Sequence, residues 1–128
     1  MYVTLPLLTI RRKVTFERIL KILFWVGCGI AVFGLSSLFM VEQTGWLRVV
    51  PYSIFGFAPL GFNHNLVAEA LTALIPISAY VAYMESDKEC KQIYSVGVAL
   101  MIFTVLLTLS RAGWLALMLQ AGIFVYFL

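Results

Sequence analysis

The amino-acid sequence predicts an all-α integral membrane protein with about four transmembrane helices, forming a fragment of a larger polytopic bundle. Of the 128 residues, 62% are hydrophobic and 12% are charged, whereas a soluble domain is about half apolar and about a quarter charged. The apolar residues gather in stretches of the length that a membrane-spanning helix needs. Because the chain also starts and ends on apolar residues, further membrane segments are expected to flank it.

The basic residues are concentrated before the first apolar stretch. Five of the nine positive charges are Arg11, Arg12, Lys13, Arg18 and Lys21. Cytoplasmic segments of membrane proteins are enriched in Lys and Arg, so residues 1–21 are predicted to be a basic lead-in at the cytoplasmic surface. Their position beside a hydrophobic span argues against binding of nucleic acid. The apolar residues 1–10 precede the basic cluster, which is the wrong order for a cleavable signal peptide.

The first transmembrane helix is predicted at residues 22–41, which are uncharged and sufficient for about 30 Å of helix. Residues 42–64 are predicted to form an outer interfacial loop, on the side of the membrane opposite residues 1–21, that is apolar and rich in aromatic side chains. Its helix-breaking residues are Pro51, Gly56, Pro59 and Gly61. The loop is therefore expected to lie in the outer membrane interface or to fold back against the bundle.

The second transmembrane helix is predicted at residues 65–84. Asn63 or Asn65 can cap its start by accepting a backbone N–H, and Pro76 is expected to kink it near the middle. A cytoplasmic turn at residues 85–92 follows. Two further transmembrane helices are then predicted, at residues 93–110 and 111–128.

Two sets of polar residues are predicted to meet near the outer membrane surface. The set on the second span is Asn65, Glu69 and Thr72. The set on the third span, continued into the fourth, is Thr104, Thr108 and Arg111. Both sets have the i, i+4, i+7 spacing of one helix face. Because antiparallel neighbours joined by a short turn normally pack together, the two faces are expected to line a polar, outward-open pocket.

Arg111 stands between two uncharged runs, residues 93–109 and 112–128, each seventeen residues long. An ionisable group at membrane depth is costly and usually serves a substrate or a partner. The planar guanidinium suits phosphate oxygens, so Arg111 is predicted to meet an anionic, phosphate-bearing ligand. The alternative is that it reaches the lipid headgroups or pairs with Glu69 to hold two helices together. Cys28 and Cys90 lack metal-ligand spacing, and no disulfide between them is expected.

Three short segments resemble those of O-antigen ligases and O-antigen polymerases. Residues 107–117, Leu-Thr-Leu-Ser-Arg-Ala-Gly-Trp-Leu-Ala-Leu, resemble the family's T-x-S-R segment with its following small residues and Leu-Ala pair. Residues 61–68, Gly-Phe-Asn-His-Asn-Leu-Val-Ala, resemble its Gly-Phe and asparagine-rich segment, and Leu74-Ile75-Pro76 resembles its later Leu-Pro. Arg48 matches an arginine often found before that segment. The resemblance covers residues 18–128.

The resemblance implies part of a multi-pass enzyme of the bacterial inner membrane. Such an enzyme moves a glycan from undecaprenyl diphosphate to an acceptor, lipid A-core or another cell-surface glycan, on the periplasmic face without a metal or cofactor. The expected partners are membrane lipids, the undecaprenyl-diphosphate-linked glycan and the acceptor. The family's catalytic histidine belongs to a later periplasmic loop that nothing here matches. No catalytic residue is therefore predicted within the chain, and the chain alone is expected to be inactive.

The residues predicted to bind the diphosphate or the glycan are Arg48, Asn63, His64, Asn65, Glu69, Ser110 and Arg111. Arg111 would stabilise charge on the leaving diphosphate, and Ser110 would add a hydroxyl donor. Glu69 would pair with Arg111 or act on the substrate. For His64 the alternative is an interfacial hydrogen bond, and for Arg48 it is an anchor to lipid headgroups.

Two other classes of protein fit the same features. A piece of a transporter or channel would also place Glu69 and Arg111 on facing helices beside a proline-kinked helix. A purely structural membrane subunit would use an internal Glu69–Arg111 ion pair to hold its helices. Within the resembling family, a ligase, a polymerase and a protein O-glycosylating enzyme are not separated by these residues.

Overall fold

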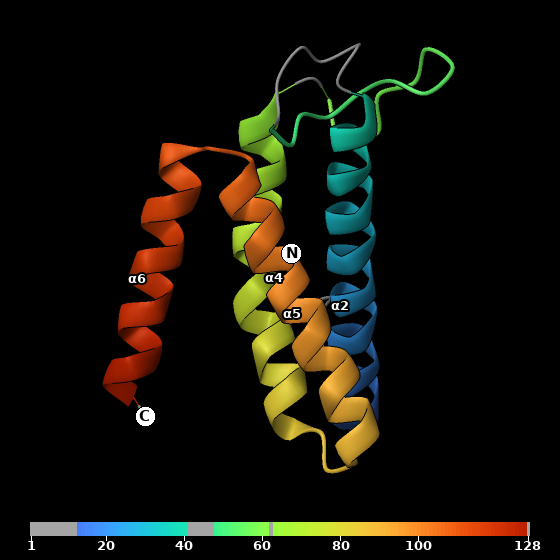
Figure 1. Ribbon diagram of the computed structural model, residues 1–128. Coiled ribbons are helices and arrows are strands. Elements are labelled where there is room, and N and C mark those ends of the chain that lie inside the picture. Colours follow the sequence, from blue (N-terminus) through green and yellow to red (C-terminus); the bar gives the residue numbers. More distant parts are fainter. Residues whose placement is uncertain (1–12, 41–47, 62, 128) are drawn as a thin grey trace, which may run out of the picture.

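A computed structural model describes residues 13–40, 48–61 and 63–127, so predictions that fall on residues 1–12, 41–47, 62 and 128 lie outside the described residues. The described chain is helical, which confirms the all-α prediction. Its elements are α2 (Lys13–Ser36), the 3₁₀ helix η1 (Ser37–Met40), α4 (His64–Met84), α5 (Lys88–Leu107) and α6 (Arg111–Phe127) (Figure 1). Apart from an isolated bridge between Ile54 and Phe57, the described residues form no β-structure.

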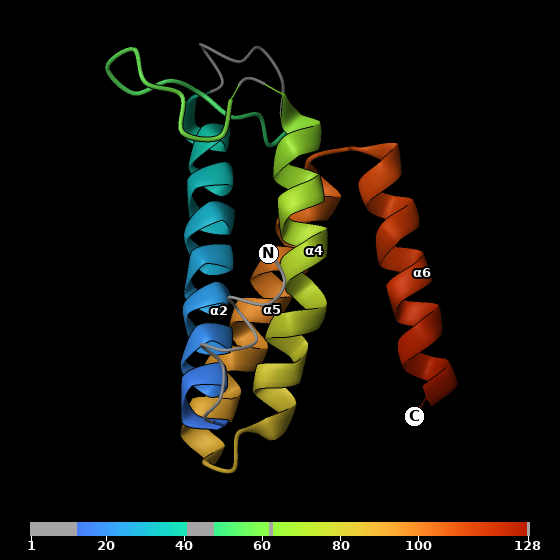
Figure 2. The same ribbon diagram turned by 180° about the vertical axis from the view of Figure 1, so that it is seen from behind.

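Helices α2, α4 and α5 pack together as an up-down-up bundle, and α6 lies beside α4 on the side away from α2 (Figures 1 and 2). The buried core runs through the three-helix part. Its residues are Phe24, Ala31, Val49, Val67, Ala68, Leu71, Ile75, Val81, Ala82, Tyr94, Met101 and Val105. On α6 only Gly113 is buried. The fold is therefore a compact three-helix bundle with a fourth helix attached along one flank.

The outer surfaces of the helices are apolar. Within the described residues, three helical segments are long and apolar enough to cross a membrane: Lys13–Met40, His64–Met84 and Lys88–Leu107. The fourth, Arg111–Phe127, is apolar but shorter. Large hydrophobic side chains such as Trp25, Val96 and Phe103 are exposed on the sides of the bundle. These features are those of a membrane protein.

Two helices begin earlier in the sequence than the predicted spans. Helix α2 already includes Lys13, and α5 begins at Lys88, after an N-cap position at Asp87. Predicted spans start where charge ends, but Lys, Glu and Arg are good helix formers whose long side chains extend from a helix into water. The helices therefore continue past the apolar stretches at this end. At the opposite end α5 stops at Leu107, before the predicted boundary at residue 110.

Small residues let the helices approach closely. A Cβ atom on Gly97 of α5 would collide with the ring of Phe24 on α2. A Cβ atom on Gly113 of α6 would lie 3.1 Å from the Cβ of Ala68 on α4. Because glycine has no side chain at these two positions, the neighbouring helix can pack directly against the backbone, as is common where helices pack in bilayers.

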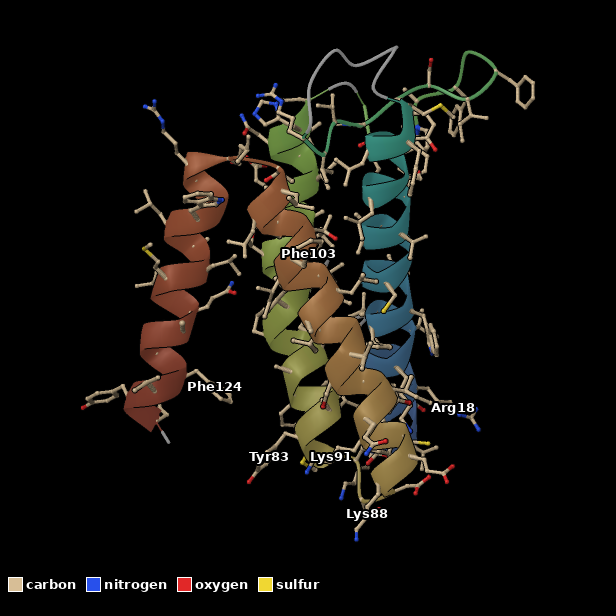
Figure 3. All side chains as sticks on the ribbon, viewed as in Figure 1. Arg18, Tyr83, Lys88, Lys91, Phe103 and Phe124 are labelled. Carbon is tan, nitrogen blue, oxygen red and sulfur yellow. The ribbon has the colours of Figure 1, made fainter. Side chains whose placement is uncertain are left out.

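The basic residues gather at one end of the bundle. We call this the basic end, formed by Lys13, Arg18, Lys21, Lys88 and Lys91. Figure 3 shows Arg18, Lys88 and Lys91 there, near the start of α2 and the α4–α5 turn. The Lys21 ammonium bonds to the Glu85 carboxylate at 3.1 Å and lies 5.8 Å from the centre of the Tyr94 ring, which ties α2, α4 and α5 together.

Candidate functional site

The predicted site residues lie at the opposite end of the bundle, which we call the loop end. It contains the end of α2, the loop at residues 48–61, the starts of α4 and α6, and the α5–α6 corner. The arginines of this end are Arg48 and Arg111. We describe the corner first, because it determines where Arg111 lies.

The α5–α6 corner is built by the residues that flank Arg111. Leu109 adopts a left-handed backbone with φ of 53°, which turns the chain. The hydroxyl of Ser110 then accepts the backbone N–H of Gly113 at 3.3 Å, as the N-cap of a helix does. Ser110 is buried. Its hydroxyl therefore starts α6, a role different from the predicted donor to a ligand.

Hydrogen bonds from both sides hold this corner in place. The Thr108 hydroxyl donates to the Val105 carbonyl at 2.6 Å. The indole N–H of Trp114 reaches back across the corner to the Leu106 carbonyl at 3.2 Å. Most of the segment that resembles the T-x-S-R motif thus has a structural task in this chain. Arg111 is the exception, because its side chain is exposed at the first turn of α6.

The start of α4 brings four of the predicted residues together. The Asn63 carboxamide accepts the backbone N–H of Asn65 at 2.9 Å, which confirms that an asparagine caps this helix. One Nη of Arg48 donates to Nδ1 of His64 over 3.4 Å. The Nε of Arg48 is buried and has no hydrogen-bond partner among the residues that the structure describes. A polar cluster with a spare cationic donor therefore forms at this terminus.

The three threonines of the predicted polar faces are turned inward. Thr72, Thr104 and Thr108 are buried, and their hydroxyls donate to carbonyls of their own chain, such as Thr104 to Leu100 at 2.8 Å. The prediction that these hydroxyls line an outward-open pocket is therefore wrong. A hydroxyl in an apolar helix can donate to a backbone carbonyl of the preceding turn. The spacing of the threonines in the sequence does not show whether their hydroxyls do so or face a pocket.

Glu69 and Arg111 lie on neighbouring helices at a similar height. Ala68 of α4 lies against Gly113 of α6. Glu69 directly follows Ala68 and Arg111 stands two residues before Gly113, so the two lie close to the same level along the bundle. Both side chains are exposed, and within the described part of the chain no ion pair joins them. Their charged groups are thus available at the surface of the loop end.

Two helix N-termini reinforce the positive charge of this end. Helices α4 and α6 both begin here, and each presents the positive end of its helix dipole, although Asn63 and Ser110 cap one N–H of each first turn. Helix starts of this kind attract phosphate and carboxylate groups. Arg48, His64 and Arg111 are located at or beside these two starts, so the loop end is suited to an anion.

A contact that no sequence motif identifies attaches α6 to α4. Pro76 has no N–H, so the carbonyl of Thr72, four residues earlier, loses its helical partner. The Gln120 side-chain amide donates to this carbonyl at 2.7 Å. The two signals that could have revealed the pair are a glutamine in an apolar helix and a proline within a neighbouring one. Together they form an interhelical hydrogen bond.

Among the described residues, no group of three or more His, Cys, Asp or Glu side chains could hold a metal ion. Cys28 and Cys90 are free thiols, the latter on α5 instead of in a loop. Comparison with known proteins finds no match to any family model, to any curated protein or to any solved structure. The resemblance to O-antigen ligases and polymerases therefore rests on the short segments quoted above.

Proposed function

We propose that the chain is part of a membrane glycan transferase of the O-antigen ligase or polymerase type, acting on an undecaprenyl-diphosphate-linked glycan at the periplasmic face of the bacterial inner membrane. The observation that carries the proposal is that Arg48, Arg111 and two helix N-termini lie at the same end of the bundle. The resemblance of residues 61–68 and 107–117 supports it, since the start of α4 and the α5–α6 corner, which belong to these segments, lie at this end.

The chemistry explains why cationic groups are needed. In such a transfer an acceptor hydroxyl attacks the anomeric carbon, and the bond to undecaprenyl diphosphate breaks. Negative charge then develops on the leaving diphosphate, and fixed cationic donors lower the energy of that transition state. The exposed guanidinium of Arg111 supplies such a donor, and the half-buried guanidinium of Arg48, held beside the start of α4 by His64, supplies a second positive charge. The general base that the attack requires would come from the later periplasmic loop.

The site residues then divide by role. Arg111 and Arg48 contact the diphosphate. His64 orients the Arg48 guanidinium through its hydrogen bond, and Asn65 lies beside the phosphate or sugar oxygens. Ser110 acts as a positioning residue, because it caps the helix whose first residue is Arg111. The exposed carboxylate of Glu69 is available to a sugar hydroxyl near Arg111.

The test is transfer from an undecaprenyl-diphosphate glycan by the full-length gene product carrying Arg111→Lys or Arg111→Ala. Lysine keeps the charge but loses the planar fork, so the pair separates charge from geometry. We expect alanine to lower transfer by roughly 100-fold or more, the size of effect found when one oxyanion donor is removed. The Arg111→Lys protein should transfer glycan at a rate between those of the parent and the Arg111→Ala protein.

The matched control is Arg18→Ala, which removes an exposed arginine at the basic end. It should leave transfer unchanged. Normal membrane insertion and abundance must be verified for each variant. If the Arg111→Ala protein transfers glycan as well as the parent, the arginine serves the fold or the lipid, and the proposed function loses its main residue.

A further inference from the structure

The loop at residues 48–61 presents an unusual aromatic tip. Backbone hydrogen bonds join Ile54 and Phe57 in both directions, at 2.9 and 3.0 Å, and close a two-residue turn. The central residues, Phe55 and Gly56, both have positive φ, at 50° and 82°. Phe55 is fully exposed, and Phe57 is 71% exposed. The turn thus displays two largely exposed phenylalanines, of which Phe55 packs against almost nothing in the described chain.

The base of the loop is fixed to the bundle. The Val49 N–H donates to the Leu107 carbonyl at 3.0 Å, at the end of α5. The Tyr52 hydroxyl bonds to the Ser36 hydroxyl at 2.7 Å, and the Tyr52 ring stacks on Phe33 with centroids 4.7 Å apart. These contacts orient the tip relative to α2, so its position is determined by the fold.

The backbone at Phe55 is strained. A two-residue turn with two positive φ angles normally uses Asn, Asp or Gly, because a side chain at this angle meets the following carbonyl. Phenylalanine offers no local hydrogen bond to offset that cost. A bulky apolar side chain held in a strained, solvent-facing position points to a contact outside the described chain.

The direction of the tip indicates what that contact is. Both ribbon views show the loop extending sideways past the end of α2, away from α6, instead of rising along the bundle axis (Figures 1 and 2). Residues 49–61 contain no charge. Phe39 on η1 is also 91% exposed at this end. Aromatic side chains at the level where membrane-spanning helices end are typical of the interface between headgroups and acyl chains.

We infer that the Ile54–Phe57 turn is a membrane wedge that inserts Phe55 and Phe57 into the leaflet surrounding the loop end. The inference uses the membrane placement of the helices and does not depend on the glycan transferase proposal. The wedge would secure α2 at the height of the interface, because its base is bonded to Ser36 and Leu107.

The test uses a nitroxide on Phe55→Cys in the chain with Cys28→Ala and Cys90→Ala, reconstituted in phospholipid vesicles. The relative accessibility of the label to oxygen, which dissolves in acyl chains, and to a water-soluble nickel chelate reports its depth. Val96→Cys on the exposed face of α5 calibrates the acyl region, and Lys88→Cys calibrates water. The ratio of oxygen accessibility to nickel-chelate accessibility should be several-fold higher for the label at position 55 than for the label at position 88.

Two results would overturn the inference. A label at position 55 with the same preference for the nickel chelate as the label at position 88 would place the tip in water. An immobilised label shielded from both reagents would mean that the tip packs against protein. Because the Phe55 side chain contacts almost nothing in the described chain, Phe55→Cys should not disturb folding, so either result is interpretable.

Discussion

Gly97 determines how closely α2 and α5 approach each other. The buried ring of Phe24 occupies the place where a Gly97 side chain would begin, and this ring also meets Tyr94 edge to face with centroids 4.8 Å apart. A phenyl ring held on two sides cannot move aside without opening the helix pair. Fitting one more methyl group there should cost about 1–3 kcal/mol.

We therefore expect Gly97→Ala to destabilise the bundle, measured as the free energy of unfolding in mixed detergent. Gly27→Ala should cost less, because its added Cβ meets the flexible side chain of Met101, at 2.6 Å from Cε. Gly29→Ala is the control, since nothing lies within 4 Å of its added Cβ. Equal losses at Gly97 and Gly29 would mean that the close contact does not govern stability.

At the residue scale, local chemistry was predictable and tertiary pairing was not. The capping role of Asn63 follows from its type and its place before an apolar helix. The pairing of Arg48 with His64, sixteen residues apart, depends on how the loop folds. Ser110 also carried a recognisable signal, because serine is a preferred N-cap residue and stands directly before an apolar helix. Because Ser110 stands next to Arg111, it was predicted to bind the ligand, whereas the structure shows it as the cap of α6.

At the scale of single elements, the attachment of α6 depends on few contacts. Gln120 bonds to the Thr72 carbonyl, which Pro76 leaves without a helical partner. Gly113 provides the close contact near the start of α6. Between α4 and α6, toward the basic end, lies an apolar cavity of about 430 Å³ that is lined in part by Pro76, Gln120 and Phe124. The Gln120 hydrogen bond thus joins the two helices at the edge of a cavity where they are not in close contact.

We expect Gln120→Leu to lower the free energy of unfolding by about 1 kcal/mol, in the range measured for interhelical hydrogen bonds in membranes. The same change in a Pro76→Ala background should cost less, because alanine restores an N–H that bonds to the Thr72 carbonyl. Unfolding of the four proteins in mixed detergent gives this coupling. Met118→Leu on the exposed face of α6 is the control. Equal losses in both backgrounds would exclude the proline-dependent bond.

The order of the helices followed from the sequence, but their ends did not. Apolar stretches indicate where a membrane can lie, and a helix in water continues until a cap or a turn residue stops it. Lys13 and Lys88 therefore fall inside helices, although both belong to charged segments. The corner at Leu109 ends α5 early, and its positive φ is not signalled by a leucine.

At the scale of the whole molecule, the charges are distributed unevenly between the two ends. Among the described residues, Lys13, Arg18, Lys21, Lys88 and Lys91 lie at the basic end. Arg48 and Arg111 lie at the loop end. Because the excess of Lys and Arg faces the cytoplasm in membrane proteins, the basic end is predicted to be cytoplasmic.

Cysteine labelling with a membrane-impermeant maleimide tests this orientation. In a chain with Cys28→Ala and Cys90→Ala, Ala112→Cys at the start of α6 should react in intact spheroplasts. Lys88→Cys should react only after lysis, because it lies at the basic end. The parent without cysteines gives the background. Labelling of Lys88→Cys alone in intact spheroplasts would reverse the orientation and place the arginines of the loop end inside the cell.

The Phe24–Gly97 contact also has a mechanical consequence. Sliding α2 along α5 by one helical turn, about 5.4 Å, would move the Phe24 ring from Gly97 into the space occupied by the buried side chain of Tyr94 or of Met101. The pair therefore has a single axial register and moves as one rod. A push on the basic end of α2 therefore cannot be absorbed by sliding of α2 along α5. We expect such a push to tilt the helix pair as a unit and to displace its opposite end, where the loop is bonded to Ser36 and Leu107.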